Sequence, residues 1–177
     1  VADRLYRGGA FEGTARSLRI ERSEIAENST NDVTGSNATR SGGLHIHNTS
    51  VDRQAPGDAM GVRIVNSTIS GNWVSATGGA MVASGNLALG LVNSTVSDNM
   101  APPTRTGGII MTTSETYPVS ASNAVPPTLA LVSSILANNS SDGGDVAHSL
   151  AVMPTFTISA ANSLVEKLCP APSCLMS

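Results

Sequence analysis

The feature that most constrains this chain is a phrase that recurs along it. Residues 64–72 and 91–99 read IVNSTISGN and LVNSTVSDN, and related segments occupy 20–28 and 131–139. The phrases close on Asn28, Asn72, Asn99 and Asn139, at intervals of 44, 27 and 40 residues. A constant phrase at uneven intervals is typical of a repeat protein whose fixed strands alternate with loops of variable length.

A second phrase, a pair of glycines followed by an apolar residue, precedes each copy. The pairs are Gly8-Gly9, Gly42-Gly43, Gly78-Gly79 and Gly107-Gly108, and Gly143-Gly144 opens a fifth copy. Glycine tolerates positive φ because it lacks a Cβ, so we expect a tight corner at each pair.

The apolar spacing within the phrase indicates strands. Val62 and Ile64 alternate with period two, as on one face of a strand, whereas helical repeats would space apolar residues three and four apart. The separation of Ile64 and Ile69 is odd, so a bend at Asn66-Ser67 is needed if both are to face the interior. Stacked repeats of three such strands predict a parallel β-helix.

Composition agrees with a thin, layered core. The 177 residues are 40% hydrophobic but only 3% aromatic, and 13% are charged. A net charge of -3 without a basic run gives no indication of nucleic-acid binding. No apolar stretch approaches the ~18 residues of a membrane span, and no cofactor motif is present. We treat residues 1–177 as a single domain with an irregular terminal coil or cap at 153–177.

Stacking predicts two polar ladders inside the repeat. We expect the closing asparagines to occupy left-handed bends, to hydrogen-bond their own backbone and to form a ladder of side-chain amides. A parallel ladder of hydroxyl groups is expected from Ser23, Ser67, Ser94 and Ser134. These residues are interpreted as turn chemistry and not as a catalytic site.

The phrases resemble a known family. The segments 8–11 (GGAF) and 78–81 (GGAM), paired with an apolar residue before x-x-Asn, are similar to the repeat of polymorphic outer membrane proteins, and NSTISGN resembles the pectate-lyase-like repeats of bacterial surface proteins. The resemblance covers about residues 8–165. It departs where the family has an aromatic before x-x-Asn, because this chain has Ile25, Ile69, Val96 or Leu136 there.

The resemblance implies a right-handed parallel β-helix (solenoid), all-β, with about four to five coils and long loops. It also implies an extracellular or bacterial cell-surface location, associated with the outer membrane, and a non-catalytic role as scaffold or adhesin.

A polysaccharide lyase or hydrolase is the alternative, since such enzymes share this fold. They resemble one another in clustering acidic residues on one exposed strand face. Alignment of the copies gives two columns that could carry catalytic carboxylates. One column consists of Glu27, Gly71, Asp98 and Asn138, and the other of Glu21, Val65, Val92 and Val132. Neither column has carboxylates on adjacent coils, and Asp142 and Asp145, the best local pair, are interpreted as turn formers.

One pair of histidines is a candidate for metal binding, and one pair of cysteines is a candidate for a disulfide. His45 and His47 should project from one outer strand face, ~7 Å apart, where a third ligand would complete a zinc or copper site. We interpret them as solvated histidines and predict no metal. Cys169 and Cys174 flank two prolines, and a secreted setting favours their oxidation, so we predict a disulfide.

Recognition is expected in the variable segments 29–41, 47–60, 100–106 and 112–127, which should emerge as loops. Trp73 should follow its phrase at a turn. The chain begins close to the first glycine corner, so we expect the first coil to stack on further β-helix coils or on a partner protein. The chain would then be part of a longer protein or of an assembly, and a polysaccharide is a second possible partner.

Overall fold

The computed structural model describes residues 11–13, 17–30, 41–48, 59–75, 78–102, 105–112, 127–140, 146–149, 157–166 and 168–169. For 11–13, 146–149 and 168–169 the backbone alone is described. In this part of the chain the protein is all-β, and its strands form parallel sheets.

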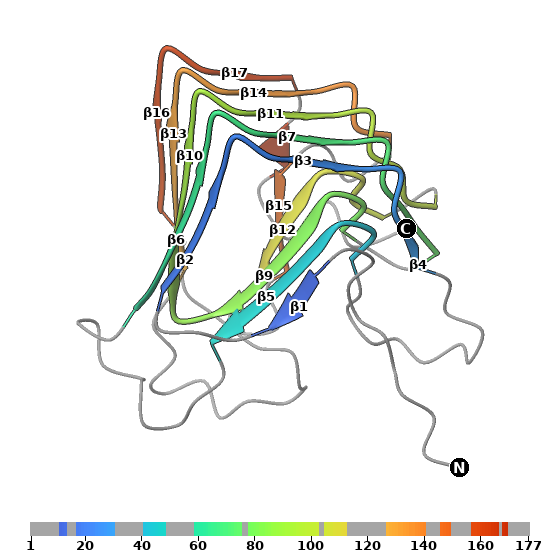
Figure 1. Ribbon diagram of the computed structural model, residues 1–177, viewed down its shortest axis with the longest axis horizontal. Helices are drawn as coiled ribbons and strands as arrows, with labels where there is room; N and C mark the ends of the chain where they lie inside the picture. Colours follow the sequence, from blue (N-terminus) through green and yellow to red (C-terminus); the bar gives the residue numbers. More distant parts are fainter. Residues whose placement is uncertain are drawn as a thin grey trace.

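Three sheets surround a common core (Figure 1). The first sheet contains, in spatial order, β1 (Phe11–Gly13), β5 (Leu44–Asn48), β9 (Met81–Gly85), β12 (Ile109–Thr112), β15 (Val146–Ser149) and β18 (Leu168–Cys169). The second contains β16 (Thr157–Ala161), β13 (Thr128–Val132), β10 (Leu87–Val92), β6 (Met60–Val65) and β2 (Ser17–Glu21). The third contains β17 (Leu164–Val165), β14 (Ile135–Ala137), β11 (Thr95–Ser97), β7 (Thr68–Ser70) and β3 (Glu24–Ala26).

The chain visits the three sheets in a repeating order, so that each repeat forms one layer. Layer 1 begins at β1, layer 2 at β5, layer 3 at β9, layer 4 at β12 and layer 5 at β15. Equivalent strands of adjacent layers pair in parallel in the three sheets, as where Ile20 is opposite Ile64, Ile64 opposite Leu91 and Leu91 opposite Leu131. The strands predicted from period-two spacing are therefore present and in register.

The core lies inside the three-sided cross-section in Figure 1. Its side chains are aliphatic, and in layer 2 both Ile64 and Ile69 are 0% exposed. The bend that brings both inward is at Asn66, which has a φ of 49°. Equivalent left-handed residues occur in the other layers at Arg22, Asn93, Ser133 and Asn162.

Two expectations about corner geometry are wrong. The left-handed residue of the second bend is not the closing asparagine but the residue before it, Gly71 in layer 2 (φ 63°) and Asp98 in layer 3 (φ 57°). Most of the described paired glycines do not have positive φ either. They are needed because layers approach closely: a Cβ on Gly43 would lie 2.5 Å from the carbonyl oxygen of Ala80, and one on Gly79 would lie 2.3 Å from that of Gly107.

A fourth short strand in layers 1 and 2 was not predicted. Strands β4 (Ser29–Thr30) and β8 (Trp73–Val74) pair in parallel, and single bridges continue this line from Trp73 to Met100 and from Met100 to Ser140. Trp73, expected at a turn, is therefore a strand residue and is partly buried.

The regular pairing also extends into residues assigned to an irregular terminal coil at 153–177. Strand β16 pairs with β13 over its whole length, and β17 pairs with β14. Residues 157–166 thus complete a fifth layer with the same corner, in which Asn162 has a φ of 52°, and β18 continues the first sheet beyond β15.

Candidate functional site

Four asparagines form a continuous ladder across layers 1 to 4, at the bend that follows the third sheet. The Oδ1 atom of Asn72 accepts from the backbone N–H and from Nδ2 of Asn28, at 3.1 and 2.9 Å. Asn99 accepts from Asn72 in the same way at 3.1 and 2.8 Å, and Asn139 from Asn99 at 3.1 and 2.8 Å. Asn72 and Asn99 are 0% exposed and Asn139 is 8% exposed.

The same amide groups also bind strand carbonyls. Asn99 Nδ2 donates to the carbonyl oxygens of Ser97, two residues earlier, and of Ile69 in the preceding layer, at 2.9 and 3.0 Å. Asn72 Nδ2 likewise donates to Ile25 O at 2.9 Å. The residue before each asparagine takes up the left-handed conformation, and the asparagine amide then bonds backbone groups of its own layer and of the neighbouring layers.

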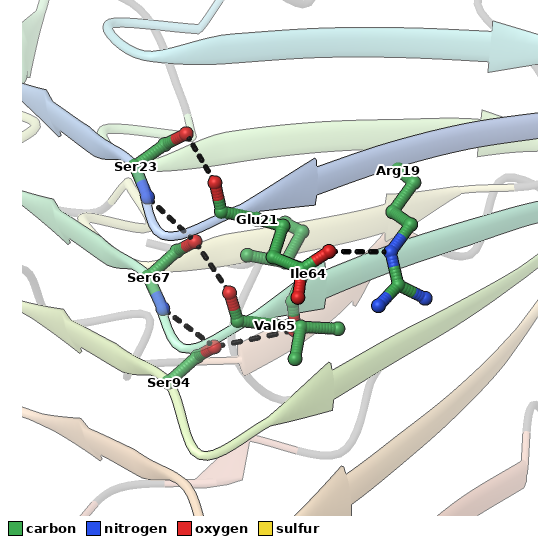
Figure 2. Close-up of polar contacts among 7 residues, drawn as sticks. All are labelled: Arg19, Glu21, Ser23, Ile64, Val65, Ser67 and Ser94. Atoms are coloured by element: carbon green, nitrogen blue, oxygen red, sulfur yellow. Dashed lines mark hydrogen bonds and ion pairs between the residues drawn. The ribbon is translucent and has the colours of Figure 1, made fainter.

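A second ladder runs along the bend between the second and third sheets (Figure 2). The Oγ atom of Ser67 accepts from the backbone N–H of Ser23 at 3.2 Å, and Ser94 Oγ accepts from Ser67 N–H at 3.3 Å. Each hydroxyl then donates to the carbonyl two residues earlier, as Ser67 does to Val65 O at 2.8 Å.

The serine ladder continues beyond the four predicted members. Ser94 N–H donates to Ser134 Oγ at 3.2 Å, and Ser134 N–H donates to Ser163 Oγ at 3.1 Å. Sequence reasoning missed Ser163, although the segment Asn162-Ser163-Leu164 repeats the Asn-Ser-x pattern of Asn66 and Asn93.

The outer columns proposed for catalysis are in the register that the alignment predicts. Glu21 is opposite Val65, Val65 opposite Val92 and Val92 opposite Val132. In the other column, Asn138 donates to Oδ1 of Asp98 and its backbone N–H donates to Oε2 of Glu166. Neither described column holds carboxylates on adjacent layers, and Asp142 and Asp145 lie outside the described residues.

One ion pair lies on the outer face of layer 1 (Figure 2). Arg19 Nε donates to Glu21 Oε2 at 2.9 Å, and the two side chains are 55% and 36% exposed. This hydrogen bond and the positive charge of Arg19 lower the pKa of Glu21, and the same bond and the negative charge of Glu21 raise the pKa of Arg19. Both side chains are exposed to solvent, so the ion pair contributes little to the free energy of folding.

The histidine pair is not the solvated pair that was expected. Leu44 and Ile46 face the core as predicted, but His45 is 0% exposed and His47 is only partly exposed. Their ring centroids are 5.6 Å apart. The prediction fails because the first sheet is buried on both faces: Met81 on the core side and Val82 on the other are each 0% exposed.

No group of three or more His, Cys, Asp or Glu side chains suited to a metal ion occurs within the described ranges. The predicted disulfide cannot be placed, because Cys174 and the side chain of Cys169 lie outside the described residues. Among the described residues there is no helix that is long and apolar enough to cross a membrane.

Apolar side chains are exposed around the serine bend toward layer 5. Val132 is 41% exposed, Ile135 44% and Leu164 56%. Val132 ends β13 and Ile135 begins β14, so they flank one bend, and Leu164 pairs with Ile135.

Comparison with known proteins does not add a family. No protein-family model matches the sequence, and no significant match was found among curated proteins or among solved structures. The class defined by the coordinates is an all-β protein of stacked parallel sheets with two internal polar ladders.

Proposed function

We propose that this protein is a right-handed parallel β-helix that serves as a non-catalytic scaffold or adhesin on the outside of the cell. The observation that carries the proposal is the in-register stacking of equivalent strands in three sheets. Parallel strands joined by a crossover are right-handed in almost all known cases, which favours that hand here. A stack of this kind buries each layer against its neighbours and is typical of rigid, elongated repeat proteins.

Variation in length is confined to two places in each layer. One is the connection from the first to the second sheet, which spans 49–59 in layer 2 and 113–127 in layer 4 but only Asn86 in layer 3. The other connects the end of one layer to the next, as at 31–40. Segments whose length varies on a constant framework are suited to recognition, so we place the binding function there.

The cell-surface setting rests on the resemblance to the repeats of polymorphic outer membrane proteins. It is supported by the abundance of aliphatic and small polar residues over charged ones, with 13% charged residues in the whole chain. The partner is a protein or a polysaccharide of the surroundings. Lyase or hydrolase activity remains the alternative, which no described column of carboxylates favours.

A shortened variant tests the scaffold role. Asn48 is opposite Gly85 and Met60 is opposite Leu87, so residues 49–59 occupy the place of Asn86. Replacing 49–59 with one asparagine should leave the urea midpoint of unfolding nearly unchanged, because the layers on either side keep their pairing. Loss of cooperative unfolding in this variant would contradict a framework with independent loops.

The enzymatic alternative is tested on the unaltered chain. Incubation with polygalacturonate, alginate or xylan should release neither new reducing ends nor unsaturated uronic acids. Release of either product, lost on heat denaturation, would replace the scaffold proposal with a polysaccharide hydrolase or lyase.

A further inference from the structure

Several asparagines of the chain begin the sequence Asn-x-Ser or Asn-x-Thr, which is the acceptor sequence for N-linked glycosylation. They are Asn28, Asn37, Asn48, Asn66, Asn93, Asn138 and Asn139. Asn37 lies outside the described residues. The structure separates the others by whether the side-chain amide is used by the fold or is presented to solvent.

The amides at the asparagine bend and in the first sheet are used by the fold. Asn28 and Asn139 belong to the asparagine ladder, and each Nδ2 also donates to the carbonyl two residues earlier. Asn48 is 2% exposed, and its Nδ2 donates to a backbone carbonyl. Asn138 is exposed, but its Nδ2 donates to Oδ1 of Asp98. A sugar on any of these nitrogens would displace a contact of the framework.

Asn66 and Asn93 differ because they lie at the serine bend. The ladder there is built by the residue that follows each of them, as Ser67 N–H donates to Ser94 Oγ. Both asparagines are exposed and left-handed, with φ of 49° and 48°. A substituent on either Nδ2 therefore meets solvent at the outer corner of the stack.

The threonines that complete these two acceptor sequences lie at the same corner. Thr68 begins β7 and Thr95 begins β11, and the two residues are opposite each other in the third sheet. Both are partly exposed, whereas the next residues of their strands face the core. Each asparagine and its threonine are thus presented on the outside of the same layer.

Asn93 also has exposed apolar neighbours. Its backbone N–H donates to Val132 O at 2.9 Å, so it lies beside the layer 4 bend that Val132 and Ile135 flank. These two side chains are 41% and 44% exposed, although layer 4 has a described layer on either side. Asn66 donates in the same way to Val92 O, but Val92 is less exposed. A pyranose ring has C–H groups on one face, and packing them on Val132 and Ile135 would remove apolar area from water.

We propose that Asn93 is an attachment site for an N-linked glycan whose first sugar covers Val132 and Ile135, and that Asn66 is a second site at the same corner. The asparagine Nδ2 forms a bond to the anomeric carbon of a sugar that is activated as a glycosyl diphosphate. The bond from that carbon to the diphosphate breaks, and the amide gives one proton to a base of the transferase. This modification is additional to the scaffold role, and it requires only that the chain is exported through a compartment that holds the transferase.

The test uses the full chain, secreted by a cell whose glycosyltransferase recognises Asn-x-Ser/Thr. Enzymatic release of the glycan in heavy-oxygen water converts each occupied asparagine to a labelled aspartate, which peptide mass spectrometry locates. In the folded, secreted protein we expect the label at Asn93 and Asn66 and none at Asn28 or Asn139. Absence of the label from Asn93, or its presence at the ladder asparagines, would overturn the proposal.

The threonines provide matched variants. Thr95→Val keeps Asn93 and the β-branched shape of residue 95 but removes the hydroxyl group, so the label at Asn93 should be lost and that at Asn66 retained. Thr68→Val should give the reverse result, and Thr95→Ser should restore the label at Asn93. A label at Asn93 that survives Thr95→Val would overturn the assignment.

Hydroxyl-radical labelling tests the covering contact. The yield at Val132 and Ile135 should be at least halved in the glycosylated parent relative to Thr95→Val. Met100, which is 48% exposed on another line of the stack, is the internal control and should react equally in both proteins. Equal yields at Val132 and Ile135 in the two proteins would overturn the cover. The urea midpoint of the loop-shortened variant is a separate readout, so failure of the glycan site is distinguishable from failure of the scaffold proposal.

Discussion

The change Asn99→Leu removes the centre of the asparagine ladder while keeping a side chain that branches at Cγ and has the same number of heavy atoms. Asn99 is 0% exposed and takes part in side-chain bonds in both directions. Its Oδ1 accepts from the N–H and Nδ2 of Asn72 at 3.1 and 2.8 Å. Its Nδ2 donates to Ile69 O, Ser97 O and Asn139 Oδ1 at 3.0, 2.9 and 2.8 Å.

The expected cost follows from the groups left behind. The buried backbone N–H of Asn72 loses its acceptor, which costs about 1–3 kcal/mol, and each further bond that is lost costs about 0.5–1.5 kcal/mol net. Because some of the carbonyls keep sheet partners, we expect a total of about 3–5 kcal/mol. That is a large fraction of the ~5–15 kcal/mol by which a typical domain is stable.

Urea unfolding followed by far-ultraviolet circular dichroism measures this loss. The control is Asn28→Leu in layer 1, where the side chain is partly buried and its amide donates, among the described residues, only to Ala26 O and Asn72 Oδ1. It should cost about 1–2 kcal/mol. Equal losses at the two positions, or a loss at Asn99 below about 1 kcal/mol, would refute the ladder as a major source of stability.

Three further changes test other parts of the stack. Gly79→Ala places a Cβ 2.3 Å from a backbone carbonyl oxygen of the next layer and should prevent folding at 37 °C or lower the urea midpoint sharply, whereas Gly61→Ala, with open space around it, should stabilise by about 0.5–1 kcal/mol. Ser94→Ala deprives a buried N–H of its acceptor and should cost about 1–3 kcal/mol in the same assay. Glu21→Gln removes a carboxyl group whose pKa Arg19 lowers. The stability that this lowered pKa contributes is present above the unfolded-state pKa of Glu21 and is lost as the pH falls through its folded-state pKa. The free energies of unfolding of the parent and the variant should therefore differ at neutral pH and converge in acid. A difference that persists unchanged in acid would contradict the ion pair.

The strands and the serine bend could be predicted because their signals are local. Burial with period two assigns Val62 and Ile64 to one face, and the odd separation of Ile64 and Ile69 requires a bend between them. Asn66 tolerates the left-handed conformation that the bend uses. These inferences need only neighbouring residues, and the structure agrees with them.

The sequence-based predictions that were wrong concern features that depend on contacts between segments distant in the sequence. The burial of His45 reflects cover on the outer side of the first sheet, which the alternation of apolar residues does not report. The role of Gly43 is to admit a carbonyl from the next layer, a contact that exists only after stacking. Ser163 was missed for a different reason, because its segment of the sequence lacks the closing asparagine by which the other copies were aligned.

The ladders also explain why the intervals between phrases are uneven. Within a layer the spacing never changes between the two laddered bends: Ser67 and Asn72 are separated by the same interval as Ser94 and Asn99. An insertion there would displace a serine or an asparagine from hydrogen bonds with the layers on both sides. At the other two connections an insertion breaks no ladder, and doubling a loop costs only about 0.6 kcal/mol in closure entropy. Length therefore varies where it is inexpensive, and any recognition by the loops can change without loss of the framework.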